Sequence, residues 1–241
     1  MSIFTAELIG TFFLILLGNG VVANVLLKGT KFNGKEGWIV ITTAWAFAVY
    51  IGVVIAGPIS GAHLNPAVTI GLLLAGDLSL SMVPTYIAAQ LIGAMLGALT
   101  VYVFYYQHYK ITDDEVAKLA TFSTIPAIKD YKWNLVSEAI GTFVLVFTIF
   151  YITGASFELE NTEVPIGLGS IGALPVGILV WVIGLSLGGT TGYAINPARD
   201  LGPRIIHTIF HGGRSQWDYA WVPVLGPILG AGLAVGIEIL I

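Results

Sequence analysis

The chain has 241 residues, of which 56% are hydrophobic and only 10% are charged. So few charges cannot coat a water-soluble globule of this size, so lipid must cover much of its surface. The chain has no cysteine, which excludes disulfides, cysteine-based metal sites and thiol catalysis. Its net charge is -4, and the sequence has no basic run of the kind that binds nucleic acid.

Six apolar stretches are long enough to cross a bilayer, which takes ~20 residues. In chain order they are residues 3–27, 38–55, 83–106, 135–155, 171–187 and 221–241. The first has no basic region before it and carries Glu7, so we expect a retained span and not a signal peptide. Two shorter segments, 65–76 and 196–210, begin with Asn-Pro and are predicted to be half-helices. The expected fold class is an all-α membrane protein.

The second half of the chain repeats the first at a distance of 131 residues. AELIGTFFLILL at 6–17 matches SEAIGTFVLVFT at 137–148. The same register relates the two turns, Asn65, Pro66 and Ala67 recurring as Asn196, Pro197 and Ala198. Each copy holds three spans, an odd number, so the second copy must lie inverted in the membrane. We expect one channel domain over 1–241, with a first repeat at 1–106, a linker loop at 107–134 and a second repeat at 135–241.

A single Asn before Pro at the start of a helix is ordinary capping. Two copies in inverted register predict that the half-helices meet at their N-termini, with Asn65 and Asn196 at the midplane. Non-helical backbone at this depth is stable only where it is buried in protein or lines a water-filled cavity. The segments before the turns are therefore expected to line a pore with the carbonyl groups of Gly61, Ala62, His63, Gly192, Tyr193 and Ala194.

These motifs resemble the aquaporin family, and within it the aquaglyceroporin or glycerol-facilitator branch. The resemblance rests on SGAHLNPAVT at 60–69 and TGYAINPARDLGPR at 191–204, and it covers essentially the whole chain. It implies six transmembrane helices and two re-entrant half-helices in the lipid bilayer of a bacterial plasma membrane. It also implies a passive channel and not an enzyme, no cofactor, and a homotetramer with one pore per subunit. The implied permeants are water, glycerol and other small neutral solutes.

The resemblance also implies that Trp45, Gly184, Tyr193 and Arg199 form the narrowest part of the pore. A buried arginine one turn after Asn196 marks a functional position. Trp45 and Tyr193 offer an apolar wall to a carbon backbone, Arg199 donates hydrogen bonds to hydroxyl groups, and Gly184 widens the slot. Tyr193 stands where glycerol facilitators are expected to have phenylalanine. We therefore expect its hydroxyl to narrow the slot or to add a donor and an acceptor.

Four charged residues are expected to support the pore without touching solute. Asp200 and Arg204 lie four residues apart on one predicted helix, where they can pair. Glu7 and Glu138 are repeat counterparts, and the resemblance implies that they accept hydrogen bonds from the re-entrant loops. The histidines are scattered, and the sequence shows no metal cluster or nucleophile–base pair. They are His63, His108, His207 and His211.

Two other functions remain open. Secondary transporters also use inverted repeats and broken helices, and a predominantly water-selective channel would share the Asn-Pro-Ala turns. A transporter would need an unpaired carboxylate or an ion site near the centre, where the sequence places only asparagine, backbone and Arg199. Oriented water at the two asparagines and the positive charge of Arg199 are expected to block protons and cations.

The orientation in the membrane is also open. All ten Lys and Arg residues fall on one side of the predicted topology, including Lys28, Lys31 and Lys35 in the first loop. The positive-inside rule places that side in the cytoplasm. The family resemblance implies that the same side is outside.

Overall fold

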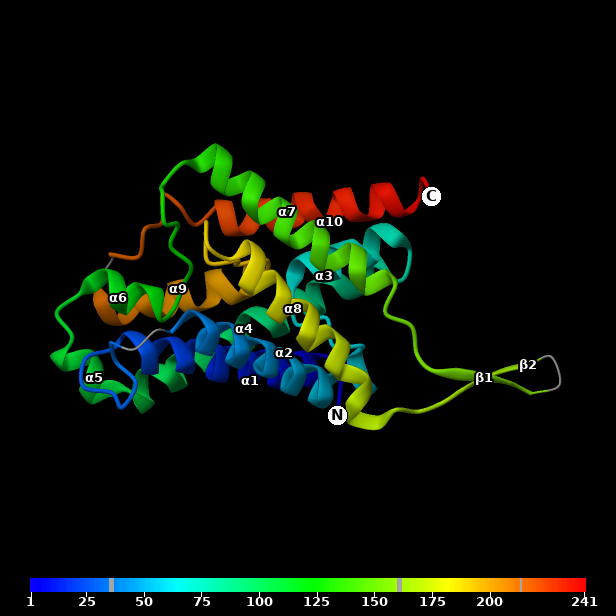
Figure 1. Ribbon diagram of the computed structural model, residues 1–241, viewed down its shortest axis with the longest axis horizontal. Coiled ribbons are helices and arrows are strands. Elements are labelled where there is room, and N and C mark those ends of the chain that lie inside the picture. The colour runs from blue at the N-terminus through cyan, green and yellow to red at the C-terminus, as the bar shows by residue number, and fades with distance from the viewer. Residues whose placement is uncertain (35–36, 160–161, 213) are drawn as a thin grey trace.

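The computed structural model describes residues 1–34, 37–159, 162–212 and 214–241, so Lys35 of the first loop lies outside the described residues. Within that part, five stretches are long and apolar enough to cross a membrane. They contain α1 (Ile3–Leu26), α2 (Trp38–Ser60), α4 (Val83–Phe104), α7 (Tyr131–Phe150) and α8 (Leu174–Leu187), with short 3-10 turns, η1 (Leu80–Met82) and η2 (Gly169–Ala173), leading into α4 and α8. The helices form one bundle (Figure 1).

The sixth expected span is α10 (Val222–Glu238), an apolar helix of 17 residues. At 1.5 Å per residue it is about 26 Å long, slightly less than the hydrocarbon thickness, and it ends at Glu238 instead of continuing to 241. Helix α7 begins four residues earlier than expected because the Asp130 side chain caps it, accepting from the N–H groups of Lys132 and Trp133. Helix α2 runs five residues further than expected, through Pro58.

Two half-helices, α3 (Pro66–Ala75) and α9 (Pro197–His211), begin at the prolines of the two turns. Asn65 caps α3 by accepting from the N–H of Ala67, and Asn196 caps α9 by accepting from the N–H groups of Ala198 and Arg199. The N-termini of the two helices lie in the interior of the bundle, from which α3 and α9 run toward opposite ends (Figure 1).

Paired glycines let neighbouring helices touch through their backbones. A Cβ added at Gly93 of α4 would lie 2.3 Å from the carbonyl oxygen of Leu8 in α1, and one at Gly230 of α10 would lie 2.2 Å from that of Ala139 in α7. Leu8 and Ala139 are 131 residues apart, but the two glycines are 137 apart (230 minus 93). The repeat therefore gains six residues before its last helix.

Helices α2 and α8 cross at equivalent points of the two copies. A Cβ at Gly177 would lie 3.0 Å from the carbonyl oxygen of Ala46, and these residues are 131 apart. Contact between counterparts is what a two-fold axis between the copies requires. The described chain thus has the aquaporin-like arrangement of an inverted repeat with two half-helices.

The remaining elements lie at the two ends of the bundle. The short helices α5 (Tyr106–Ile111), which begins one residue before the expected linker, and α6 (Glu115–Ala120), within it, lie at one end. At the other end lie both termini and an antiparallel hairpin of β1 (Ser156–Leu159) and β2 (Thr162–Pro165), which projects beyond the helices (Figure 1). The hairpin was not expected from the sequence, and α7 ends at Phe150, five residues before the end of the predicted fourth span.

Candidate pore and filter

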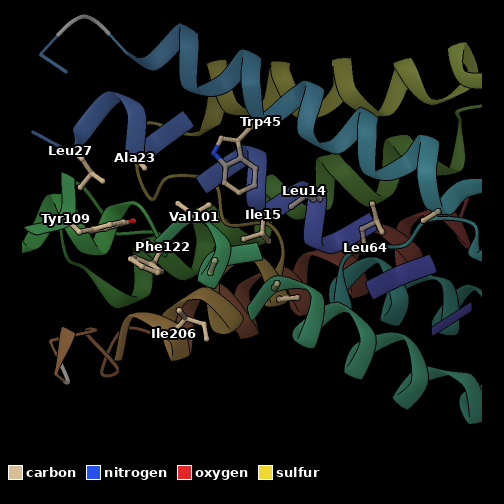
Figure 2. Packing of buried hydrophobic residues seen from close by; sticks show 14 of the residues in the cluster. Leu14, Ile15, Ala23, Leu27, Trp45, Leu64, Val101, Tyr109, Phe122 and Ile206 are labelled. Atoms are coloured by element: carbon tan, nitrogen blue, oxygen red, sulfur yellow. The ribbon is translucent and has the colours of Figure 1, made fainter. Parts of the chain in front are cut away.

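A cavity of about 150 Å³ lies between the two halves. It is lined by Asn65 and Asn196 and by three of the four expected filter residues, Trp45, Tyr193 and Arg199. Figure 2 shows Trp45 with Leu14 and Leu64, which line the same cavity, in the surrounding hydrophobic cluster. Much of the remaining wall is formed by aliphatic side chains, among them Val49, Val53, Val176, Val180 and Leu145.

The two asparagines join the halves by reciprocal hydrogen bonds. Asn65 Nδ2 donates to the carbonyl of Ile195 at 2.7 Å, and Asn196 Nδ2 donates to the carbonyl of Leu64 at 2.9 Å. Each asparagine Oδ1 is occupied by its own helix cap. Each amide has two N–H groups, and these bonds use only one of them. One donor on each asparagine therefore remains for a molecule in the cavity.

Two buried carboxylates hold the loops that precede the turns. Glu7 accepts from the N–H groups of His63 and Leu64 at 2.9 and 2.7 Å. Its counterpart Glu138 accepts from those of Ala194 and Ile195 at 2.9 and 2.8 Å. The Ser60 hydroxyl also donates to Glu7, at 2.6 Å, and the hydroxyl of its counterpart Thr191 donates to Glu138.

The carboxylates stabilise a strained backbone. Ala62 and Leu64 have φ of 53°, and their counterparts Tyr193 and Ile195 have 39° and 43°. Left-handed conformations cost non-glycine residues roughly 1–3 kcal/mol each and persist only where the surroundings fix them. N–H groups of the loops donate to Glu7 and Glu138, so the loop carbonyls are left free to accept hydrogen bonds from solute. In the described part of the chain, no hydrogen bond uses the carbonyls of the six expected lining residues, Gly61, Ala62, His63, Gly192, Tyr193 and Ala194.

Arg199 is buried beside the cavity and is held on two sides. Its Nη1 donates to the carbonyl of Phe122 at 3.3 Å, an oxygen that also accepts from Asn19. Its guanidinium carbon lies 4.3 Å from the centre of the Trp45 ring. These contacts leave other N–H groups of the guanidinium available in the cavity.

The end of the cavity with Arg199 is polar and aromatic, and its inverted counterpart is apolar. The positions 131 residues from Trp45, Gly184, Tyr193 and Arg199 are Val176, Val53, Ala62 and Val68, which all line the cavity. Trp45 fits because a Cβ at Gly18 would lie 2.5 Å from its ring. The counterpart of Gly18 is Ile149, which lines the same cavity as the smaller Val176. The two ends of the cavity therefore differ in chemistry.

Gly184 does not leave an empty space, because the Tyr193 ring occupies it. A Cβ at Gly184 would lie 2.9 Å from Tyr193 Cζ. The Tyr193 hydroxyl is buried and has no hydrogen-bond partner among the described residues. This placement argues against the expectation that the hydroxyl acts directly on solute.

Asp200 and Arg204 form a fully buried ion pair, with Arg204 Nε 2.8 Å from Asp200 Oδ1. Asp200 also accepts from the N–H and hydroxyl of Thr124, and Arg204 donates to the carbonyls of Thr124 and Ser215. The pair thus ties the loop that carries Phe122, and hence the support of Arg199, to the half-helix α9.

The described residues contain no group of three His, Cys, Asp or Glu placed to hold a metal ion. His63 stacks on Tyr86 with ring centroids 4.1 Å apart. Sequence reasoning missed Gln90, which donates to Glu7 at 2.8 Å, as well as Asn19, Phe122 and Thr124. Ser60 and Thr191 were visible as counterparts in the repeat, but not as partners of the carboxylates.

The comparison with known proteins agrees with this geometry. The chain matches the family described as Major intrinsic protein over residues 1–237. It is 53% identical over 233 residues to a probable glycerol uptake facilitator protein of Thermotoga maritima, covering 95% of each chain. It is 51% identical to the glycerol uptake facilitator protein of Bacillus subtilis, covering 95% of this chain and 81% of the relative.

The fold is also similar to the crystal structure of the aquaglyceroporin from Plasmodium falciparum. The TM-score is 0.84 at 31% identity, over 98% of this chain and 93% of that one. Fold, turns and sequence therefore agree, and the chain belongs to the major intrinsic protein family, the family of the aquaporins that its motifs resemble.

Proposed function

We propose that this protein is a passive channel for glycerol and related polyols and for water, and that it excludes protons and ions. The observation that carries the proposal is the composition of the cavity wall. The unpaired carbonyls belong to six loop residues, of which all but Gly192 line the cavity, together with two asparagine amides, Arg199, Trp45 and a row of aliphatic side chains. A polyol has hydroxyl groups on one edge and carbon on the other, so it matches this wall. The relatives named as glycerol uptake facilitators support the choice of solute.

Each polar and apolar group along the cavity wall has a role in this proposal. Solute hydroxyls donate to the carbonyls of residues 61–63 and 192–194 and accept from Asn65, Asn196 and Arg199, while the carbon chain passes the valines and leucines. A solute leaves water without losing all its hydrogen bonds, and each bond is replaced by the next along the row. Trp45, Gly184, Tyr193 and Arg199 form the proposed filter.

Protons and cations are excluded by the midplane and the filter. The free N–H groups of Asn65 and Asn196 donate to the oxygen of a permeating water, so its hydrogens turn away and the water chain is interrupted. The positive ends of α3 and α9 face the same point, each with about half an elementary charge, and Arg199 adds a full charge. A cation receives no compensating carboxylate, since the oxygens of Glu7 and Glu138 are taken by the loops.

We further propose that the chain acts as a single channel domain, with repeats 1–106 and 135–241, in the cell membrane of a bacterium. A homotetramer is inferred from the family resemblance. An apolar groove on α1 and α2, lined among others by Leu17, Ile39 and Phe47, is available to pack against another subunit. We assign both termini to the cytoplasm by the same resemblance, which a protease-accessible tag at either terminus will test.

The direct test is stopped-flow swelling of proteoliposomes with paired water and glycerol gradients. A channel gives glycerol uptake proportional to the gradient, without saturation, and independent of sodium or proton gradients. Saturation or ion coupling would establish a transporter instead. Water flux without glycerol flux would establish a water-selective channel.

A further inference from the structure

The Tyr193 ring lies on a seat formed by two glycines of α8 and its end. Gly184 and Gly188 are four residues apart, so they follow each other on one face of the helix. A Cβ at Gly184 would lie 2.9 Å from Tyr193 Cζ, and a Cβ at Gly188 would lie 2.6 Å from Tyr193 Cδ1. The ring therefore spans both positions, with its base over Gly188 and its tip over Gly184.

The seat is closed on its other sides. Trp38 meets the Tyr193 ring edge to face, with centroids 6.0 Å apart, and a Cβ at Gly188 would lie 2.7 Å from Trp38 Cζ2. The carbonyl oxygen of Gly184 would be 2.5 Å from the same Cβ. The ring itself lines the cavity, so a ring displaced from α8 would move into the cavity.

Glycine at 188 is not required by backbone conformation. Its φ is −76° and its ψ is −16°, which any residue adopts. The neighbouring Gly189 has nothing within 4 Å of an added Cβ among the described residues. Contact with the filter ring therefore distinguishes Gly188 from Gly189.

We propose that Gly188 is a positioning residue that sets the width of the pore, because its missing side chain allows the Tyr193 ring to lie back against α8. A side chain at 188 moves the ring into the path of the solute. The effect depends on solute size, so the larger polyol is hindered more than water. This inference rests on the proposed function, in which Tyr193 belongs to the filter.

The test compares Gly188→Ala with Gly189→Ala in proteoliposomes, measuring glycerol and water permeability of the same preparations. Gly188→Ala is expected to lower the ratio of glycerol to water permeability by about tenfold, the scale on which one methyl group alters a close-fitting site. Gly189→Ala is expected to keep the wild-type ratio. Equal ratios in the two variants, or an equal fall of both permeabilities in Gly188→Ala, would overturn the proposal.

A second pair of variants checks that the ring transmits the effect. In a Tyr193→Ala background there is no ring to displace, so adding Gly188→Ala should change the ratio by no more than about twofold. If Gly188→Ala still lowered the ratio of glycerol to water permeability about tenfold in this background, residue 188 would act without Tyr193, which also overturns the proposal. By contrast, a wild-type protein that conducts no glycerol would refute the proposed function itself.

Discussion

Arg199 and Trp45 are stacked, with the guanidinium carbon 4.3 Å from the centre of the indole ring. The Arg199 guanidinium and the Trp45 ring of the proposed filter therefore hold each other in place. Trp45 is in turn seated on Gly18, and Arg199 on the Phe122 carbonyl. Both residues of the proposed filter thus pack on groups, Gly18 and the Phe122 carbonyl, that do not line the cavity.

Replacing Arg199 by lysine keeps the charge but removes the planar fork that stacks on Trp45 and donates in several directions at once. We expect Arg199→Lys to lower glycerol permeability about tenfold, a loss of about 1.4 kcal/mol. The matched control is Arg214→Lys, since Arg214 is exposed and pairs only loosely with Glu115 at 3.9 Å. The stacking argument fails if the two variants conduct glycerol equally in the swelling assay.

Tyr193→Phe should leave the ratio of glycerol to water permeability within about twofold of wild type, because the hydroxyl is buried without a partner and its removal leaves no donor or acceptor unpaired. The melting temperature should be unchanged or slightly higher. Tyr86→Phe is the contrasting variant, since the Tyr86 hydroxyl donates to the Ser60 carbonyl at 2.7 Å. It should cost about 1 kcal/mol of stability. A large shift of the ratio in Tyr193→Phe would show that solute does reach the hydroxyl.

Asp200→Asn should destabilise the protein by about 3–5 kcal/mol, because it leaves the buried Arg204 charge without its partner. The melting temperature in detergent measures this. Asp218→Asn breaks an exposed ion pair with Lys129, so this variant should have the melting temperature of the wild type. Similar melting of both variants would mean that Arg204 is satisfied by the Thr124 and Ser215 carbonyls alone.

Gly230→Ala should destabilise the protein by about 1–3 kcal/mol, since the added methyl overlaps the Ala139 carbonyl and the helices must separate. Gly93→Ala, at the equivalent contact with Leu8, should cost a similar amount. Gly232→Ala lies on the same helix with nothing within 4 Å of its Cβ among the described residues, and it should be neutral. Tolerance of Gly230→Ala would contradict the backbone contact between α7 and α10.

The sequence predicted what the repeat encodes. The spacing of 131 residues relates Glu7 to Glu138, Gly10 to Gly141 and the two Asn-Pro-Ala turns, and each pair plays the same part in both halves. Gly10 receives Leu64, and Gly141 receives the counterpart Ile195. Such pairs can be predicted because a duplicated segment repeats its packing.

Contacts without a counterpart in the repeat could not be predicted in this way. The bonds from Asn19 and Arg199 to the Phe122 carbonyl join residues 103 and 77 positions apart, and a backbone acceptor has no sequence signal. The packing of Tyr193 on Gly184 could not be predicted, because a glycine in the sequence indicates missing volume without showing which side chain fills it. The six extra residues before α10 also break the register, and part of the difference lies in the half-helices, since α9 has 15 residues and α3 has 10.

The reciprocal bonds of Asn65 and Asn196 have a consequence for biosynthesis. The Leu64 carbonyl receives its donor from a residue that is translated 132 positions later, and the Ile195 carbonyl receives its donor from the first half. We therefore expect the re-entrant loop of the first half to stay incomplete until the second half has been synthesised. The pore is then formed only when both halves are present.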